Sequence, residues 1–213
     1  MNAAIFFDTE TTGLPLFKEP SEHPSQPHIV QLAACIVDLD TRKTIASMDV
    51  IVKPDGWTIP DEVAAIHGIT TEHAMQVGVP EALVVDMFLA LWGRNSQKLR
   101  IAHNESFDAR ILRIAIKRHI DPRTPGVKIA VSDLWKSGAA ECTQIMATPI
   151  VKAPPTEKMK AMGRNHFKSA NLGEAYEHFT GKKLENAHSA MTDVQGCMAV
   201  YFAIKDLARE KAA

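Results

Sequence analysis

Two carboxylates at the end of a short apolar run are the first residues in this sequence that could do chemistry. Asp8 and Glu10 follow residues 3–7, a run that suits a buried strand. Because side chains alternate along a strand, the two acids would face the same side. Buried together they repel each other and lose hydration, which a bound cation corrects. Oxygen ligands favour a hard ion such as Mg²⁺ or Mn²⁺. Taken alone, the pattern also fits acids at a strand end that face water.

A second candidate segment, residues 103–108, places a histidine and an aspartate between another short apolar run and a helical pattern. Asp108 would lie in the first turn of that helix. An acid in the first turn is also favoured by the helix dipole. The segment on its own therefore has an ordinary structural explanation.

A third segment, residues 188–193, opens the last helical pattern of the chain with His188 and Asp193. A separation of five residues brings these side chains together only if His188 leans back from the preceding loop. Ser189 could instead simply cap the helix, with Asp193 in solvent. Three segments that each place an acid at a strand end or a helix start nevertheless favour one shared site.

Hydrophobic periodicity indicates which elements must position these residues. Four prolines mark residues 15–27 as a loop, and residues 38–43 carry a hairpin signal. The expected strands cover residues 3–7, 29–37, 44–52, 99–102 and 127–131. The main expected helices begin at Pro60 and Pro80 or cover residues 106–119, 171–179 and 189–207. This order predicts an α/β sandwich with a mixed sheet.

Length, charge and cysteine content exclude several classes of protein. The chain has 213 residues and a net charge of −1, so it fits one domain and is not a histone-like binder that holds nucleic acid by bulk charge. Its three cysteines, at 35, 142 and 197, form no C-x-x-C pair, which argues against a disulfide framework or a thiolate zinc site. The sequence contains neither a secretory signal nor a membrane span, and we expect a cytoplasmic protein with no membrane partner.

The three segments resemble the motifs of the DEDDh 3′–5′ exonucleases, the DnaQ-like family that includes the proofreading epsilon subunit of DNA polymerase III. The matching stretches are FDTETTG (7–13), HNESFD (103–108) and HSAMTD (188–193), supported by IVQLA (29–33) and IHGIT (66–70). The resemblance covers about residues 3–204. It implies a ribonuclease-H-like fold, with a five-stranded mixed β-sheet flanked by helices on both faces, and a single exonuclease domain over residues 1–213.

The same resemblance assigns roles to the acids and to one histidine. It implies that Asp8, Glu10, Asp108 and Asp193 hold two divalent ions, Mg²⁺ or Mn²⁺, and that His188 is the general base. This agrees with the chemistry of the residue types. Two metal ions can flank a scissile phosphate, and an imidazole, whose ordinary pKa is about 6.5, suits a base at neutral pH.

Weaker implications concern the substrate. By the resemblance, the backbone from Thr11 to Gly13 meets the 3′-hydroxyl of the terminal nucleotide. The other implied substrate contacts are Leu14 near the last base, Asn104 and Phe107 in the cleft, and His67 on the strand. Core, loop and turn roles would explain the same residues.

Two segments are longer than a compact member of this family needs, namely residues 15–27 and an extended, proline-containing basic insertion at about 136–168. Between positions 152 and 168 the only acid is Glu157, and the cations are Lys152, Lys158, Lys160, Arg164 and Lys168. A basic flap beside an acidic metal site suits binding to a phosphate backbone. A solvated, partly mobile loop is an equal alternative.

The sequence therefore predicts a metal-dependent 3′–5′ exonuclease that releases nucleoside 5′-monophosphates from DNA, at single-stranded or frayed 3′ ends. An exoribonuclease and a non-catalytic nucleic-acid-binding module are the alternatives. The complete set of acids with His188 argues against the non-catalytic one. A stand-alone repair role and a role beside a DNA polymerase in proofreading both remain open, as does the oligomeric state.

Overall fold

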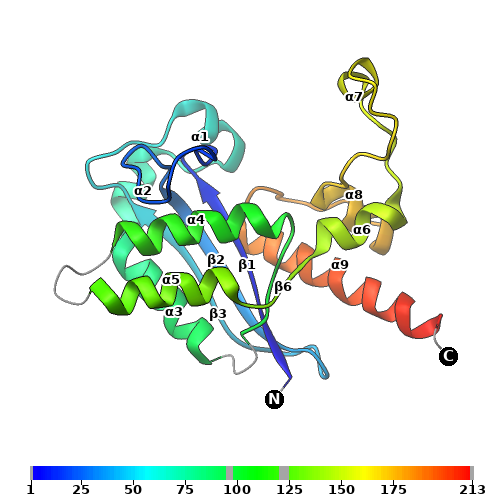
Figure 1. The fold of residues 1–213 in the computed structure, drawn as a ribbon, viewed down its shortest axis with the longest axis horizontal. Helices are drawn as coiled ribbons and strands as arrows, with labels where there is room; N and C mark the ends of the chain where they lie inside the picture. Colours follow the sequence, from blue (N-terminus) through cyan, green and yellow to red (C-terminus); the bar gives the residue numbers. More distant parts are fainter. Residues whose placement is uncertain (1, 95–97, 120–124, 212–213) are drawn as a thin grey trace.

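One mixed β-sheet organises the fold (Figure 1), and the computed structural model describes it over residues 2–94, 98–119 and 125–211. The strand order is β4-β3-β2-β1-β5-β6. The strands are β1 (Ala3–Thr11), β2 (Ile29–Asp38), β3 (Thr44–Lys53), β4 (Val79–Pro80), β5 (Arg100–Ala102) and β6 (Ala140–Cys142). Strands β1, β2 and β3 pair antiparallel, and the other pairings are parallel. The predicted mixed α/β sheet is confirmed, and the two-residue edge strand β4 makes six strands where five were expected.

Helices cover both faces of this sheet. They are α1 (Asp61–His67), α2 (Thr71–Val77), α3 (Glu81–Arg94), α4 (Glu105–Arg118), α5 (Pro125–Ser137), α6 (Thr143–Val151), α7 (Glu157–Ala161), α8 (Leu172–Thr180) and α9 (Ala190–Glu210). Helices α3, α4 and α5 lie on one face and α9 on the other (Figure 1). No helix in the described part of the chain is both long and apolar enough to cross a membrane.

The alternation of side chains along β1 divides the core into two layers. Ala3, Ile5 and Phe7 pack in the layer under α3, α4 and α5. Ala4 and Phe6 pack in the layer against α9. This alternation matters for the acids further along β1, because it decides which helix each one faces.

The strand predicted at residues 127–131 is wrong, because this stretch lies in α5. The β-branched residues suggested a strand, but Val131 and Trp135 both pack toward the core at helical spacing. Trp135 is fully buried, its indole N–H donates to the carbonyl of Ala109 (3.0 Å), and its ring contacts Phe7 and Phe88. Tertiary packing thus overrides local strand propensity. The sheet position beyond β5 is filled by β6 instead.

Part of the predicted insertion belongs to the body of the fold. β6 pairs with β5, and α6 packs with α8 and α9 in a small apolar cluster. Only residues 153–168, called the arm here, project away from the body, with α7 at the tip (Figure 1). The base of the arm is closed by a hydrogen bond from the Lys168 N–H to the Ala153 carbonyl (3.1 Å).

Candidate active site

The first two acids lie where β1 continues beyond its apolar half. Asp8 and Glu10 extend the row of Ala4 and Phe6, so they face the side of the sheet that α9 covers. They lie near the carboxyl end of β1, a strand that is central in the sheet. The sequence-based expectation that both acids share one face agrees with this placement.

Asp108 comes from the opposite layer and reaches the same edge through a gap in the sheet. β5 pairs with β1 only at Ile5 and Phe6, so the edge of β1 beyond this point has no strand beside it. The free N–H of Thr9 donates to Asp108 Oδ1 (3.0 Å), and the Thr9 hydroxyl donates to the same oxygen (2.7 Å). The early end of β5 therefore lets a carboxylate from α4 take the place of a neighbouring strand.

Asp193 and His188 complete the group from the start of α9. His188 has a left-handed backbone (φ 70°) and its N–H donates to Asp193 Oδ2 (3.3 Å). Non-glycine residues rarely adopt this conformation. It turns the histidine back toward the helix, as the five-residue spacing requires. Potential ligand atoms of Glu10, His188 and Asp193 all lie within 4.8 Å of one another.

Burial raises the pKa values of all four carboxyl groups, and repulsion from the other acids of the group adds to this for Asp8 and Glu10. Burial is the largest cause for each, and it raises the pKa of Glu10 to about 8 and that of Asp108 to about 7. The pKa of Asp8 is also well above its usual range, through burial and repulsion from Asp108, Asp193 and Glu10. Burial likewise raises the pKa of Asp193, against the opposing effect of the His188 N–H. A cation that binds to this group would therefore displace protons from the carboxyl groups.

The metal-free protein should show this repulsion as a pH-dependent cost. Glu10 has a pKa of about 8 when folded, against an ordinary 4.5, so between these values the folded state holds a proton that the unfolded state has lost. Stability from this group is therefore lost as the pH rises. We expect Glu10→Gln to gain on the order of 5 °C in melting temperature over the wild type at pH 8.5, and little at pH 4.5. Thermal unfolding in chelator measures this, and a difference that does not grow with pH would contradict it.

The donor atoms present fit divalent cations. Asp193 Oδ1 is buried and has no hydrogen-bond partner among the described residues. A buried carboxylate oxygen without a partner is costly, and a cation would satisfy it. Oxygen donors supplied by four carboxylates, with an imidazole beside them, are the ligand set of hard divalent ions.

The residues expected to contact substrate occupy more varied positions. The Thr11 hydroxyl donates to the Gly13 carbonyl (2.8 Å), and Gly13 has a φ of 152° that favours glycine. Leu14 follows and is 74% exposed. This stretch therefore forms a tight turn that leads directly from the acids to an exposed apolar side chain.

The other three expected contacts differ in exposure. His67 ends α1, its Nδ1 accepts from the Ile69 N–H (3.1 Å), and its buried Nε2 has no partner among the described residues. Burial and the nearby His188 lower the pKa of His67. Asn104 is exposed with a left-handed backbone, and Phe107 is half-buried against the core. The structure thus brings His67 near His188 and gives Phe107 a packing role.

Two polar residues that the sequence did not indicate as part of the site hold neighbouring segments in place. Gln31 on β2 accepts a hydrogen bond from the Ala190 N–H (3.2 Å) and donates to Asp49 (2.7 Å), which fixes the start of α9. The His103 ring bonds the Thr143 hydroxyl (2.9 Å) and the Ala170 carbonyl (3.0 Å), and burial lowers its pKa. A polar residue within an apolar strand was a usable signal for Gln31. The partners of His103 lie 40 and 67 residues away, so no local pattern indicates them.

The sheet order and the helices on both faces place the chain in the ribonuclease-H-like class of α/β folds. Solved complexes of Escherichia coli exonuclease I share the fold. The chain matches the complex with a dT13 oligonucleotide at 21% identity and a TM-score of 0.69, over 96% of this chain and 41% of the other. The complex with a dA16 oligonucleotide and the zinc-bound complex with single-stranded DNA each match at 21% identity and a TM-score of 0.68, over 97% of this chain and 41% of theirs. This chain thus spans less than half the length of those proteins.

The family follows from the sequence as a whole. The exonuclease family model RNase_T matches residues 5–201, a range that contains all four acids and His188. The chain belongs to this exonuclease family. A search among curated proteins found no match.

Proposed function

We propose that residues 1–213 act as one exonuclease domain that removes nucleotides from the 3′ end of single-stranded DNA and releases nucleoside 5′-monophosphates. The observation that carries this proposal is the convergence of Asp8, Glu10, Asp108 and Asp193 beside His188. Membership in the exonuclease family supports it, as does the shared fold with complexes that hold dT13 and dA16. A polymerase partner has no observation behind it, and the proposal does not include one.

In this mechanism the four carboxylates would hold two divalent ions, Mg²⁺ or Mn²⁺. When bound, such ions stabilise negative charge on the scissile phosphate and on the leaving oxygen. His188 takes the proton of the attacking water, because its ring lies at the mouth of the acidic group with Asp193 beside it. The phosphodiester bond breaks on the 3′ side of the penultimate nucleotide, so the terminal nucleotide leaves with its 5′-phosphate.

Recognition of the end falls to the turn that follows β1. The backbone of Thr11 to Gly13 would meet the 3′-hydroxyl, and Leu14 would pack against the last base. Asn104, Phe107 and His67 would line the path of the strand. The exposure of Leu14 and the unpartnered Nε2 of His67 support these contacts.

A digestion panel tests the proposal directly. Oligomers of DNA and RNA, labelled at either end, are incubated with Mg²⁺, with Mn²⁺ and with excess chelator. We expect mononucleotides from the 3′ end of DNA, no cleavage of circular single strands, and no activity in chelator. Faster cleavage of RNA would favour an exoribonuclease, and binding without cleavage a non-catalytic module. Nicking of circular DNA or full activity in chelator would contradict the mechanism.

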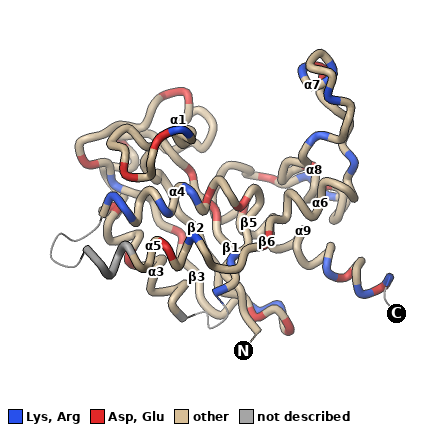
Figure 2. Tube along the Cα trace, in the orientation of Figure 1, with Lys and Arg blue, Asp and Glu red and all other residues tan. Residues whose placement is uncertain are grey.

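The arm is proposed to contact phosphates of the single strand. Its Lys and Arg residues lie on a segment that projects from the body of the fold (Figure 2). Lys160 is paired with Glu157 (2.7 Å) and Lys168 with Glu174 (2.6 Å). Lys158 and Arg164 have no ion pair with another described residue, so they are better placed to meet a ligand.

Neutralising Lys158 and Arg164 to glutamine should weaken binding with little change in the chemical step. Each lost phosphate contact reduces the slope of log affinity against log salt by about 0.7 for a single strand. The measurement is binding to a DNA oligomer at several salt concentrations, together with KM and kcat. Lys43→Gln with Lys211→Gln is the matched control, since both lysines are exposed elsewhere. An unchanged slope in the arm variant would show that the arm does not touch the strand.

A further inference from the structure

The loop between β1 and β2, residues 12–28, holds large apolar side chains in solvent. Leu14 is 74% exposed, Phe17 69% and Leu16 39%. The same loop buries Gln26 to 2% exposure. A loop that buries its glutamine and exposes its phenylalanine is not arranged to maximise apolar burial.

This loop consists of successive hydrogen-bonded turns. Backbone hydrogen bonds close residues 16–19 (3.0 Å), 20–23 (3.1 Å) and 23–26 (3.0 Å). The Gln26 side chain joins the turns from inside, because its Oε1 accepts from the Leu16 N–H (3.0 Å) and its Nε2 donates to the carbonyls of Leu16 (3.1 Å) and Pro20 (2.9 Å). Phe17 and Lys18 are the two central residues of the first turn, so they form its tip.

Helix α4 clamps the loop over residues 19–27. Four cations on three successive turns of α4 reach groups of the loop more than 90 residues away in sequence. These contacts are Arg110 to the Glu19 carbonyl (2.7 Å), Arg113 to the Ser21 hydroxyl (3.1 Å), Lys117 to the Glu22 carboxylate, and Arg118 to the carbonyls of Gln26 (2.7 Å) and Pro27 (3.0 Å). The exposed side chains thus project from a fixed scaffold.

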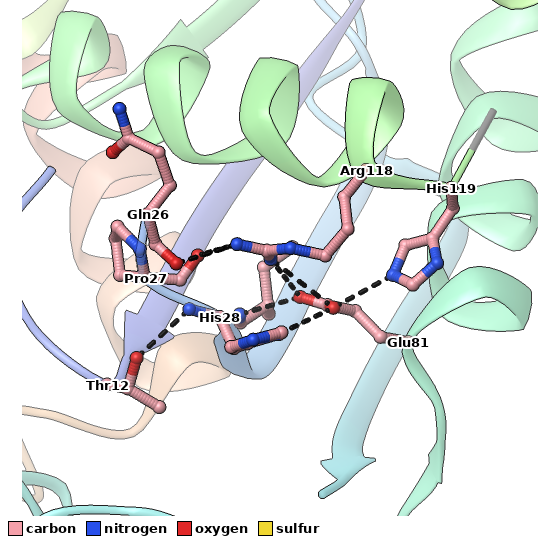
Figure 3. A network of polar contacts seen from close by, with 8 residues as sticks. Thr12, Gln26, Pro27, His28, Glu81, Arg118 and His119 are labelled. Carbon is pink, nitrogen blue, oxygen red and sulfur yellow. Dashed lines mark hydrogen bonds and ion pairs between the residues drawn. The ribbon is translucent and has the colours of Figure 1, made fainter. Parts of the chain in front are cut away.

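The end of the loop is fixed by the buried carboxylate of Glu81 (Figure 3). It accepts from the Ile29 N–H (2.9 Å) and contacts the rings of His28 (2.9 Å) and His119 (2.8 Å). These hydrogen bonds outweigh burial and hold the pKa of Glu81 far below its usual range. The Thr12 N–H donates to the His28 carbonyl (3.0 Å), and the His28 N–H donates to the Thr12 hydroxyl (3.0 Å). These two hydrogen bonds connect the Glu81 network to the turn beside the acids.

We propose that Phe17 stacks on a base of the strand that is being cut, among the three nucleotides nearest the 3′ end. This inference rests on the proposed function. The loop leaves β1 after Thr11, one residue beyond Glu10, and lies at the edge of the sheet where β1 ends (Figure 1). An aromatic ring beside a lysine is the combination that binds single strands without sequence preference, by stacking and by attraction to phosphate. A preformed loop reduces the entropy cost of that contact.

The test measures binding of DNA oligomers in an Asp193→Asn background, which the mechanism predicts does not cut. Phe17→Ala should weaken binding roughly 5- to 150-fold, the scale of one stacked base, and Phe17→Trp should restore it. Single abasic sites are then placed at each of the three 3′ nucleotides. At one of these positions the abasic site should remove the difference in affinity between the parent and Phe17→Ala, because the ring then has no base to stack on.

Ile45→Ala is the matched control, because Ile45 is 48% exposed on β3, at the end of the sheet away from the acids. Equal binding by Phe17→Ala and the parent would overturn the proposal, as would a penalty that survives all three abasic sites. The latter result would indicate a structural role for Phe17 or a contact with the sugar–phosphate backbone. Failure of the proposed function would appear separately, as absence of cleavage by the protein with native Asp193 and Phe17.

Discussion

Asp8→Asn is expected to abolish most turnover while leaving the fold intact. The substitution keeps the shape of the side chain and removes one of the four charges that would hold the metal ions. Metal ions supply several kcal/mol to such reactions, and about 1.4 kcal/mol corresponds to a factor of ten, so the rate should fall roughly 10³-fold or more. The measurement is single-turnover release of the 3′ nucleotide, with thermal unfolding on the same preparation.

The metal-free Asp8→Asn protein should also be at least as stable as the wild type. Burial and three neighbouring acids raise the pKa of Asp8, and the amide carries no charge to be repelled. Asp40→Asn is the control, since Asp40 is exposed in the β2–β3 turn, far from the site. Retention of more than about a tenth of the wild-type rate would remove Asp8 from the metal-binding group; lost stability would assign it a structural role.

His188→Ala is expected to slow turnover roughly 10²- to 10⁴-fold, the scale of general-base catalysis. Affinity for the metal ions should change little, because His188 is proposed to act on water. The two roles need separating, because a ring nitrogen of His188 and carboxylate oxygens of Glu10 and Asp193 lie within 4.8 Å of one another and could share one ion. Single-turnover cleavage and metal titration on one preparation separate the two roles.

His73→Ala controls for loss of an imidazole, because His73 is exposed on α2. If His188→Ala loses metal affinity and regains a normal rate at saturating metal, His188 is a ligand and another group must take the proton. A slow rate at every metal concentration would support the base.

Local sequence was enough to place Asp8 and Glu10 on one face of a strand, because that placement depends on spacing within a single element. Asp8 and Glu10 alternate on one strand, and the run that precedes them is apolar enough to be buried. The strand predicted at residues 127–131 was wrong for the opposite reason. These residues have a high β propensity. However, Val131 and Trp135, four residues apart, both pack against the core, and a helix places both on one face.

The features that the sequence did not predict depend on side-chain contacts that no local pattern indicates. Residues 15–27 read as a loop, and nothing local shows that Gln26 holds three turns together or that α4 clamps them. Glu81 likewise looks like a helix start, whereas its carboxylate joins β2 and the end of α4. The contacts that α4 makes with the loop, and those of Glu81 with β2 and His119, span 38 to 95 residues, which periodicity does not reveal.

The hydrogen bond at the base of the arm has a consequence for how this chain tolerates changes in length. Ala153 and Lys168 are neighbours in space, 3.1 Å apart between carbonyl oxygen and amide nitrogen. A short turn can therefore bridge them, and the cost of closing a loop grows only slowly with its length. We therefore expect deletions and insertions between these two residues to leave the sheet, the acids and His188 where they are. On this expectation the arm is a module whose size can vary independently of the body of the fold.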